Sequence, residues 1–241
     1  MALFNDEKIL GVLSGQWGDH GLPPAQSSFS MHAMVARHYL DGGNYPIGSA
    51  RRIAETTTDY LESMGGKVYV HAGVDEILTH NGKITGIRME NGEEVQASFV
   101  ISSAGVMNTY GKFLRNHNRH HAFSAQLKTV QPTASYVCLY IGLNKSAEEL
   151  DLKNTNLWIY PDYNHDENVA NYMKDQKAEL PVVYISFPSA KDPAFAKEHP
   201  GAATMEAITI APWEDYGKWK NKPWKNRGED YEETKDKISQ R

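Results

Sequence analysis

The sequence predicts a mixed fold, in which an α/β segment is followed by an α+β segment with a mixed or antiparallel sheet. Residues 41–105 have the pattern of a helix, a strand and two hairpins. Residues 134–211 contain four strand candidates separated by long excursions, without regular alternation with helices. With 241 residues, of which 40% are hydrophobic and 23% charged, the chain is long enough to bury a sizeable core.

Two helices are expected before residue 41. The first runs from Asn5, as its N-cap, to Leu13, because Ile9, Leu10 and Leu13 recur on one face. The second covers Ser28–Leu40, where apolar residues again recur at helical spacing.

A loop rich in glycine and proline, residues 15–24, connects these helices and carries Trp17. Trp17 either anchors the loop to the core or faces a substrate, because loops that hold such side chains are often functional. His32 in the second helix is either a hydrogen-bonded packing residue or a proton donor that faces a pocket.

Residues 41–105 are the segment around which the chain is organised. Ser49 is expected to cap a helix that Gly65-Gly66 ends, because glycine accepts the left-handed conformation found at helix C-termini. Four strands follow, three of them joined by Asn-Gly turns. They are Lys67–His71, Val74–Thr79, Ile84–Met89 and Val95–Ile101.

The second half of the chain begins with a basic stretch, residues 107–121, that predicts a loop. The four strands of the α+β segment are expected at Ala134–Leu143, Asn156–Tyr160, Pro181–Phe187 and Ala203–Ala211. Helices are expected at Asn168–Lys177 and, as a charged C-terminal helix, over residues 228–241.

Three tryptophans lie among lysines in residues 211–227, namely Trp213, Trp219 and Trp224. Interleaved basic and aromatic residues occur at nucleic-acid and membrane interfaces. Because the formal net charge is −5, no nucleic-acid partner is expected. The interpretation is a solvated loop anchored by its indoles, with contact to a membrane surface as the alternative.

Composition also limits the location of the protein. No run of 18 apolar residues occurs, so no transmembrane helix is expected, and the acidic N-terminus does not resemble a secretory signal. The single cysteine, Cys138, excludes an internal disulfide and fits a reducing compartment. We therefore expect a cytoplasmic protein, with peripheral membrane contact as a variant of that location.

Three closely spaced histidines, His117, His120 and His121, raise the question of a metal site. No cysteine or carboxylate lies among them, and Arg115 and Arg119 would repel a cation. No metal is therefore expected.

The order of motifs resembles the FAD-dependent oxidoreductases of the phytoene desaturase, carotenoid isomerase and retinol saturase family, with the retinol-saturase-like branch most similar. The motifs are Tyr45-Pro46-Ile47-Gly48, Gly65-Gly66-Lys67-Val68, Val74-Asp75-Glu76-Ile77, Gly82-Lys83-Ile84-Thr85-Gly86-Ile87 and Val100-Ile101-Ser102-Ser103-Ala104-Gly105. The likeness extends to Gly15-Gln16-Trp17-Gly18-Asp19, Phe187-Pro188-Ser189 and Asp192-Pro193. It therefore covers most of the chain.

The resemblance implies a partial FAD/NAD(P)-binding Rossmann-like domain and a substrate-binding domain with a mixed antiparallel sheet. No G-x-G-x-x-G turn, which normally begins such a flavin domain, occurs in the sequence. The expected division is a helical part of the substrate region in residues 1–40, a second FAD-contacting segment in 41–110, and a substrate-binding domain in 111–241. We expect this central region alone to bind FAD poorly and the last domain to be incomplete at its C-terminus.

The resemblance also implies roles for individual residues. Val74, Ala104 and Gly105 correspond to positions that contact FAD. The substrate region would include Tyr45, Pro46, Gly48, Trp17 and His32. No catalytic residue is assigned, because the flavin performs the difficult step and an apolar polyene offers no charged group to bind. The implied reaction is saturation, desaturation or isomerisation of carbon-carbon double bonds, with NAD(P)H as a candidate electron donor.

Two other functions remain open at this stage. A flavin amine oxidase has the same order of strands and helices, but it would need aromatic residues that enclose an amine, and no such pattern stands out. A non-catalytic α+β module that binds an apolar ligand or a partner protein would fold cooperatively without flavin.

Overall fold

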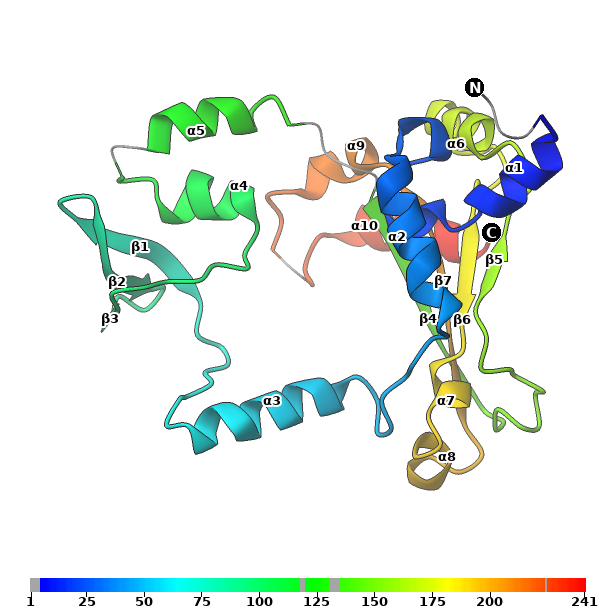
Figure 1. Cartoon of the computed structure of the whole chain (residues 1–241), viewed down its shortest axis with the longest axis horizontal. Coiled ribbons are helices and arrows are strands. Elements are labelled where there is room, and N and C mark those ends of the chain that lie inside the picture. Colours follow the sequence, from blue (N-terminus) through cyan, green and yellow to red (C-terminus); the bar gives the residue numbers. More distant parts are fainter. Residues whose placement is uncertain (1–4, 118–119, 131–134, 224) are drawn as a thin grey trace. The chain divides into compact units, whose positions relative to one another are not determined.

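The computed structural model describes residues 5–117, 120–130, 135–223 and 225–241 (Figure 1). The chain divides into two compact units. The first unit consists of residues 1–56 and 133–241, and the second of residues 57–132. The predicted division at residues 40 and 110 is a functional one and stays a prediction.

A four-stranded antiparallel sheet forms the centre of the first unit. Its strands are β4 (Ser135–Leu143), β5 (Leu157–Ile159), β6 (Val183–Ser186) and β7 (Ala203–Ala211), in the spatial order β4-β7-β6-β5. All three pairings are antiparallel, which decides between the two predicted kinds of sheet. The four predicted strands are confirmed, and β5 and β6 are shorter than expected.

The N-terminal helices of the first unit lie close to their predicted positions. α1 covers Glu7–Ser14 and α2 covers Phe29–Leu40. The cap of α1 is Asp6 and not Asn5, because the Asp6 carboxylate accepts hydrogen bonds from two backbone N–H groups of the first turn. The loop between α1 and α2 contains two short 3-10 helices, η1 (Trp17–Asp19) and η2 (Pro24–Gln26).

The core of the first unit forms where η1 packs against the sheet and against α6 (His165–Lys174). Four side chains at its centre are almost inaccessible to solvent, namely Trp17, Tyr172, Val182 and Ile210. α6 begins three residues before the predicted start at Asn168. The side chain of Asn164 caps it by accepting a hydrogen bond from the backbone of Glu167.

The C-terminal part contains α9 (Trp213–Tyr216), η4 (Gly217–Trp219) and α10 (Glu229–Ser239). Trp219 is only 3% exposed, and its indole N–H donates to Asp230 at 3.0 Å. It therefore anchors this segment, in agreement with the interpretation of a loop held by its indoles. Trp213 is 49% exposed, and Trp224 lies outside the described residues.

α3 (Arg51–Ser63) begins in the first unit and ends in the second. The predicted glycine stop is confirmed, since Gly65 has a φ of 83° and the N–H of Gly66 bonds back to Leu61. Ser49 precedes the helix, and its hydroxyl accepts a hydrogen bond from the backbone of Arg51 at 3.4 Å.

A three-stranded antiparallel sheet, in the order β1-β2-β3, forms the second unit. Its strands are β1 (Val74–His80), β2 (Lys83–Met89) and β3 (Glu94–Gln96). Asn81 and Gly82 both have positive φ, so they form the predicted tight hairpin turn.

Two predicted strands of the second unit are wrong. Lys67–His71 is not a strand, and the strand expected at Val95–Ile101 ends at Gln96. Strands need a hydrogen-bonded neighbour, and the described residues provide none for either stretch. The apolar side chains there stay exposed, as Val70 at 78% and Ile101 at 84% illustrate.

Residues 107–121 are helical over much of their length, where a loop was predicted. α4 (Val106–Asn108) continues directly into a π-helical turn, η3 (Thr109–Phe113), and α5 covers His120–Leu127. Hydrogen bonds from the backbone and the hydroxyl of Thr109 to the carbonyl of Gly105 start the first helical turn. Such local bonds leave no apolar periodicity in the sequence, which explains the missed helix.

Candidate functional site

One face of the four-stranded sheet is unusually rich in aromatic hydroxyls. Alternate residues of a strand point to the same face, and cross-strand pairs lie side by side. The pairing register therefore places one set of side chains together, which we call the tyrosine face. Its members are Tyr136, Cys138, Tyr140, Trp158, Tyr184, Ser186, Glu206, Ile208 and Ile210.

The tyrosine face changes from apolar to polar along the strands. At one end Ile210 pairs with Tyr136 and belongs to the core around Trp17. The opposite end is polar, because Glu206 in the central strand β7 pairs with Tyr140 on one side and with Ser186 on the other. The face therefore offers an apolar wall with a polar end.

Asp19, the last residue of η1, lies beside this face. Burial raises the pKa of its carboxyl group, and a hydrogen bond with Tyr39 of α2 partly offsets this shift. The Asp19 charge in turn helps to raise the pKa of Tyr136 and Tyr184, whose own burial is the larger cause. At neutral pH these hydroxyls stay protonated and can donate hydrogen bonds.

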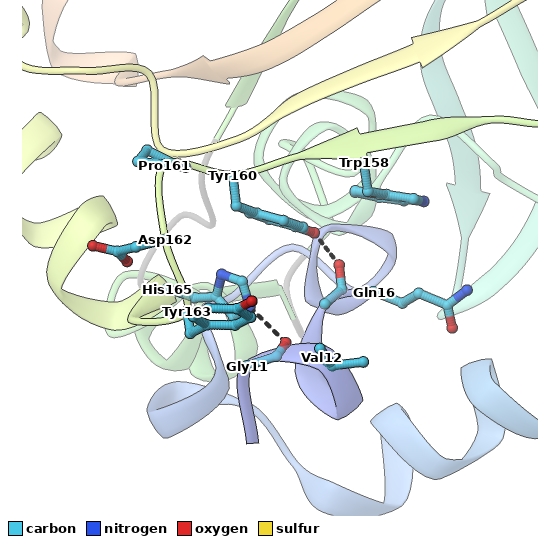
Figure 2. Close-up of a pocket in the computed structure, with 10 residues that line it drawn as sticks. Gly11, Val12, Gln16, Trp158, Tyr160, Pro161, Asp162, Tyr163 and His165 are labelled. Carbon is cyan, nitrogen blue, oxygen red and sulfur yellow. Dashed lines mark hydrogen bonds between the residues drawn. The ribbon is translucent and has the colours of Figure 1, made fainter. Parts of the chain in front are cut away.

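A hollow of about 580 Å³ opens between α1 and the chain that follows β5 (Figure 2). The Tyr160 hydroxyl donates to the carbonyl of Gly15. His165 donates to the carbonyl of Gly11 at 2.8 Å, as Figure 2 shows. The last carbonyls of a helix have no partner within the helix. His165 supplies a donor for one of them and Tyr160 a donor for the carbonyl of the C-cap residue Gly15, so the polar groups of this hollow hold the C-terminal end of α1.

Asp192, between α7 (Pro188–Lys191) and α8 (Phe195–Glu198), holds the Tyr45–Ser49 segment. Its carboxylate accepts hydrogen bonds from the backbone N–H groups of Gly48 and Ala194, each at 3.0 Å. The bond from Gly48 is the main reason why the pKa of Asp192 is lowered.

Of the predicted substrate residues in this segment, Gly48 is bonded to Asp192 and Tyr45 lies close enough to Glu206, at the polar end of the tyrosine face, to interact with its charge. Burial raises the pKa of Tyr45, and the charges of Asp192 and Glu206 add to the shift. Pro46 is half-buried, and Gly48 has a φ of 87°, a conformation that glycine adopts without strain.

Lys191 completes the polar end. Its ammonium group donates to the Ser186 hydroxyl at 2.7 Å and to the side-chain oxygen of Asn156. Burial lowers the pKa of Lys191, while the Glu206 charge acts in the opposite direction. The lysine is thus held near Glu206 by neutral partners.

The structure places the other two predicted substrate residues in supporting positions. Trp17 is completely buried, in agreement with the interpretation as a loop anchor. His32 has both ring nitrogens within hydrogen-bond distance of a partner, the Leu13 carbonyl at 2.8 Å and His20 at 3.4 Å. Its role in substrate binding stays a prediction.

The predicted cofactor residues lie in the second unit. Val74 begins β1 and pairs with Met89. Ala104 and Gly105 form an exposed turn before α4, and Gly105 has a φ of 86° with open space around the position of a Cβ atom. An exposed backbone with glycine at positive φ fits a segment that lies along an extended dinucleotide.

Side-chain hydrogen bonds connect β1, which begins at Val74, to the segment that follows η3. Arg115 donates to the Asp75 carboxylate at 2.6 Å, which lowers the pKa of Asp75. Glu76 is buried and accepts hydrogen bonds from Arg88 and, at 2.6 Å, from Asn116.

Comparison with known proteins identifies the family. No protein-family model matches the chain. It is 35% identical over 97% of its length to an all-trans-retinol 13,14-reductase of Danio rerio. A neurosporene-forming phytoene desaturase of Cereibacter sphaeroides is 29% identical over 76% of the chain, and a prolycopene isomerase of Daucus carota is 26% identical over 80%.

The chain belongs to the retinol saturase and carotenoid desaturase-isomerase family. It spans 40%, 35% and 29% of the lengths of these three relatives, respectively. The fold agrees with this assignment. A crystal structure of an oxidoreductase from Methanosarcina mazei superposes on 89% of the chain with a TM-score of 0.64 at 18% identity, and the match covers 46% of that chain.

Sequence reasoning missed three residues that this family member places on or beside the tyrosine face. Asp19 and Asp192 lie inside motifs that carried the resemblance, but their side-chain roles depend on contacts distant in sequence. Glu206 did leave a signal, because it is the one charged residue of the strand Ala203–Ala211. A charge in a central strand indicates either an internal partner or a ligand.

Proposed function

We propose that the protein to which this chain belongs is an FAD-dependent oxidoreductase that acts on carbon-carbon double bonds of an apolar polyene or isoprenoid. The observation that carries the proposal is the joint occurrence, in one family member, of a cofactor-type segment and an aromatic sheet wall. The relatives support it, since their names describe a retinol reductase, a phytoene desaturase and a prolycopene isomerase.

The tyrosine face would bind the substrate. Rings of Tyr184 and Trp158 lie 4.7 Å apart, and Ile208 pairs with Tyr184 in the neighbouring strand. Flat aromatic and aliphatic side chains suit a flat conjugated chain, because the hydrophobic effect and dispersion require no charged partner. These residues would orient the polyene and exclude water from its double bonds.

The residues of the second unit would hold part of the FAD. Val74 would offer backbone groups to it, and the exposed turn at Ala104 and Gly105 would allow its close approach. When bound, FAD supplies the electron-transfer chemistry that amino-acid side chains lack. Replacing Gly105 by valine would oppose binding, because a β-branched residue is strained at a φ of 86°.

Saturation of a double bond requires two electrons and two protons, so a saturating enzyme needs a reductant. We include NAD(P)H in the proposal as the electron donor for that direction. Among the described residues no helix is long and apolar enough to cross a bilayer. Because polyenes partition into lipid, we also propose peripheral membrane contact from a cytoplasmic location, which co-sedimentation with lipid vesicles tests.

The test uses the full protein that contains this chain, purified with FAD, and its Gly105→Val variant. We expect the wild type to carry a yellow chromophore and to change the absorbance spectrum of all-trans-retinol or phytoene when the matching electron donor or acceptor is present. Gly105→Val should bind FAD at least tenfold more weakly while the sheet of the first unit keeps its thermal stability. A colourless wild type that leaves both polyenes unchanged would contradict the proposal.

A further inference from the structure

Glu206 is a half-buried carboxylate at the centre of a sheet. Its strand β7 lies between β4 and β6, and its neighbours along the strand on the same face are Thr204 and Ile208. Among the described residues no side chain donates a hydrogen bond or forms an ion pair with this carboxylate. Partial removal of a carboxylate from water without such a partner is unfavourable, and a ligand that donates a hydrogen bond would offset that cost.

The groups around Glu206 limit what that ligand can be. Lys191 is close enough to interact with it electrostatically and would repel a ligand ammonium group. Glu206 itself would repel a carboxylate. Tyr45 and Tyr140 lie beside it as neutral hydroxyls, because their pKa values are raised above the ordinary value of 10.0. A neutral ligand hydroxyl could donate to Glu206 and accept from a tyrosine.

We infer that Glu206 is a specificity-determining residue that accepts a hydrogen bond from a hydroxyl group at one end of the polyene. This inference rests on the proposed function. From Ile210 to Glu206 the face extends about 14 Å along β7, at roughly 3.4 Å per residue. The apolar chain of the alcohol lies along this stretch, and its hydroxyl reaches the polar end.

The polar neighbours of Glu206 fit this assignment. The side-chain oxygens of Ser186 and Asn156 already accept hydrogen bonds from the Lys191 ammonium group. Asp192 is occupied by the backbone of Gly48 and Ala194. Glu206, by contrast, accepts no side-chain hydrogen bond from the described residues, so its oxygens can accept the hydrogen bond of a substrate hydroxyl.

The experiment compares an alcohol with a hydrocarbon in the full, FAD-containing protein. The alcohol is all-trans-retinol, and the hydrocarbon is the same polyene with a methyl group in place of the hydroxymethyl group. Glu206→Leu should lower kcat/KM for the alcohol about 10- to 100-fold, the range for a hydrogen bond to a charged group. It should leave kcat/KM for the hydrocarbon within about twofold.

Two further variants make the test specific. Glu206→Gln keeps an acceptor and the shape of the side chain, so it should lose only part of the preference for the alcohol. Glu148→Gln removes an exposed carboxylate outside the tyrosine face and should leave both substrates unaffected. Equal effects of Glu206→Leu on the alcohol and the hydrocarbon, or no effect on either, would overturn the inference.

A binding measurement separates this inference from the proposed function. Quenching of protein fluorescence gives the Kd of each polyene without turnover. If the wild type converts neither compound, the proposed function fails, and the inference is then decided by binding alone. A Kd for the alcohol that rises at least tenfold in Glu206→Leu, with an unchanged Kd for the hydrocarbon, supports it, and equal Kd changes for the two compounds overturn it.

Discussion

The two units of the chain bury their apolar residues to very different extents. The first unit has a closed core, in which Trp17 and Ile210 are almost completely buried between a sheet and a helix. In the second unit the strongly buried apolar side chains among the described residues are Ile77 and Leu127, whereas Phe99 is 77% exposed.

This difference in apolar burial indicates which unit contributes more to stability and which one exposes apolar side chains. Burial of apolar area is the main favourable contribution to folding, so we expect the first unit to contribute more of the stability of the chain than the second. The second unit depends more on hairpin turns and on the paired Glu76. Several of its apolar side chains, Val70, Phe99 and Ile101 among them, are more than 70% exposed.

The largest expected effect that tests this comparison comes from the core of the first unit. Trp17→Ala should lower the free energy of unfolding by about 3–5 kcal/mol, because it leaves a cavity that the sheet and α6 cannot close. Urea denaturation measures this value. The matched aromatic change in the second unit, Phe99→Ala, should stay within about 1 kcal/mol. Similar losses in the two variants would show that the units do not differ in this way.

A smaller effect is expected from a glycine in the sheet of the second unit. A Cβ atom at Gly86 would lie 2.2 Å from the carbonyl oxygen of Val95. Gly86→Ala should therefore weaken the β2–β3 pairing at a cost of about 1–3 kcal/mol and increase amide hydrogen exchange in β3. Gly142→Ala in β4 is the control, since nothing lies within 4 Å of its Cβ position. Unchanged exchange in β3 would contradict this prediction.

The smallest effect concerns the link between Asp192 and the Tyr45–Ser49 segment. Because the folded-state pKa of Asp192 lies below its ordinary value of 3.8, its charge stabilises the folded state above that value. This contribution is lost as pH falls through the lower, folded-state pKa. Asp192→Asn should therefore lower Tm near neutral pH.

The Tm difference between wild type and Asp192→Asn should shrink as pH falls below about 4. Thermal melts at a series of pH values measure it. A difference that is constant from neutral to acidic pH would mean that the Asp192 charge does not contribute through these hydrogen bonds. Asp166→Asn is the comparison variant. Asp166 accepts one backbone hydrogen bond, from Ala25 in the same unit, so this substitution should lower Tm by less than Asp192→Asn does.

Local features of the sequence were sufficient to predict much of the fold. The Asn81-Gly82 turn, the stop at Gly65-Gly66 and the four strands of the first unit all depend on short-range conformational preferences and on patterns within a few residues. The family resemblance rested on the same local motifs, and the relatives confirm it.

The failures have a common physical cause. Residues 97–101 are apolar and β-branched enough to predict a strand, but a strand exists only where a neighbour accepts its hydrogen bonds. The helix at residues 106–113 starts from bonds to the Gly105 carbonyl and not from an apolar stripe. A sequence pattern indicates the conformational preference of a segment, whereas strand pairing depends on which other segments lie beside it in the folded chain.

The features of the candidate site likewise divide into those that local sequence predicted and those that depend on tertiary contacts. The sequence by itself determined the family, the strands of the sheet and the Tyr45–Ser49 segment, because these follow from motifs and periodicity. Only the tertiary structure decided that Trp17 lies in the core and that Tyr45 lies beside Glu206. The hydrogen bond from Gly48 to Asp192 joins residues 144 positions apart, and the β4–β7 register pairs residues as distant as Ser135 and Ala211. No local pattern in the chain encodes such contacts.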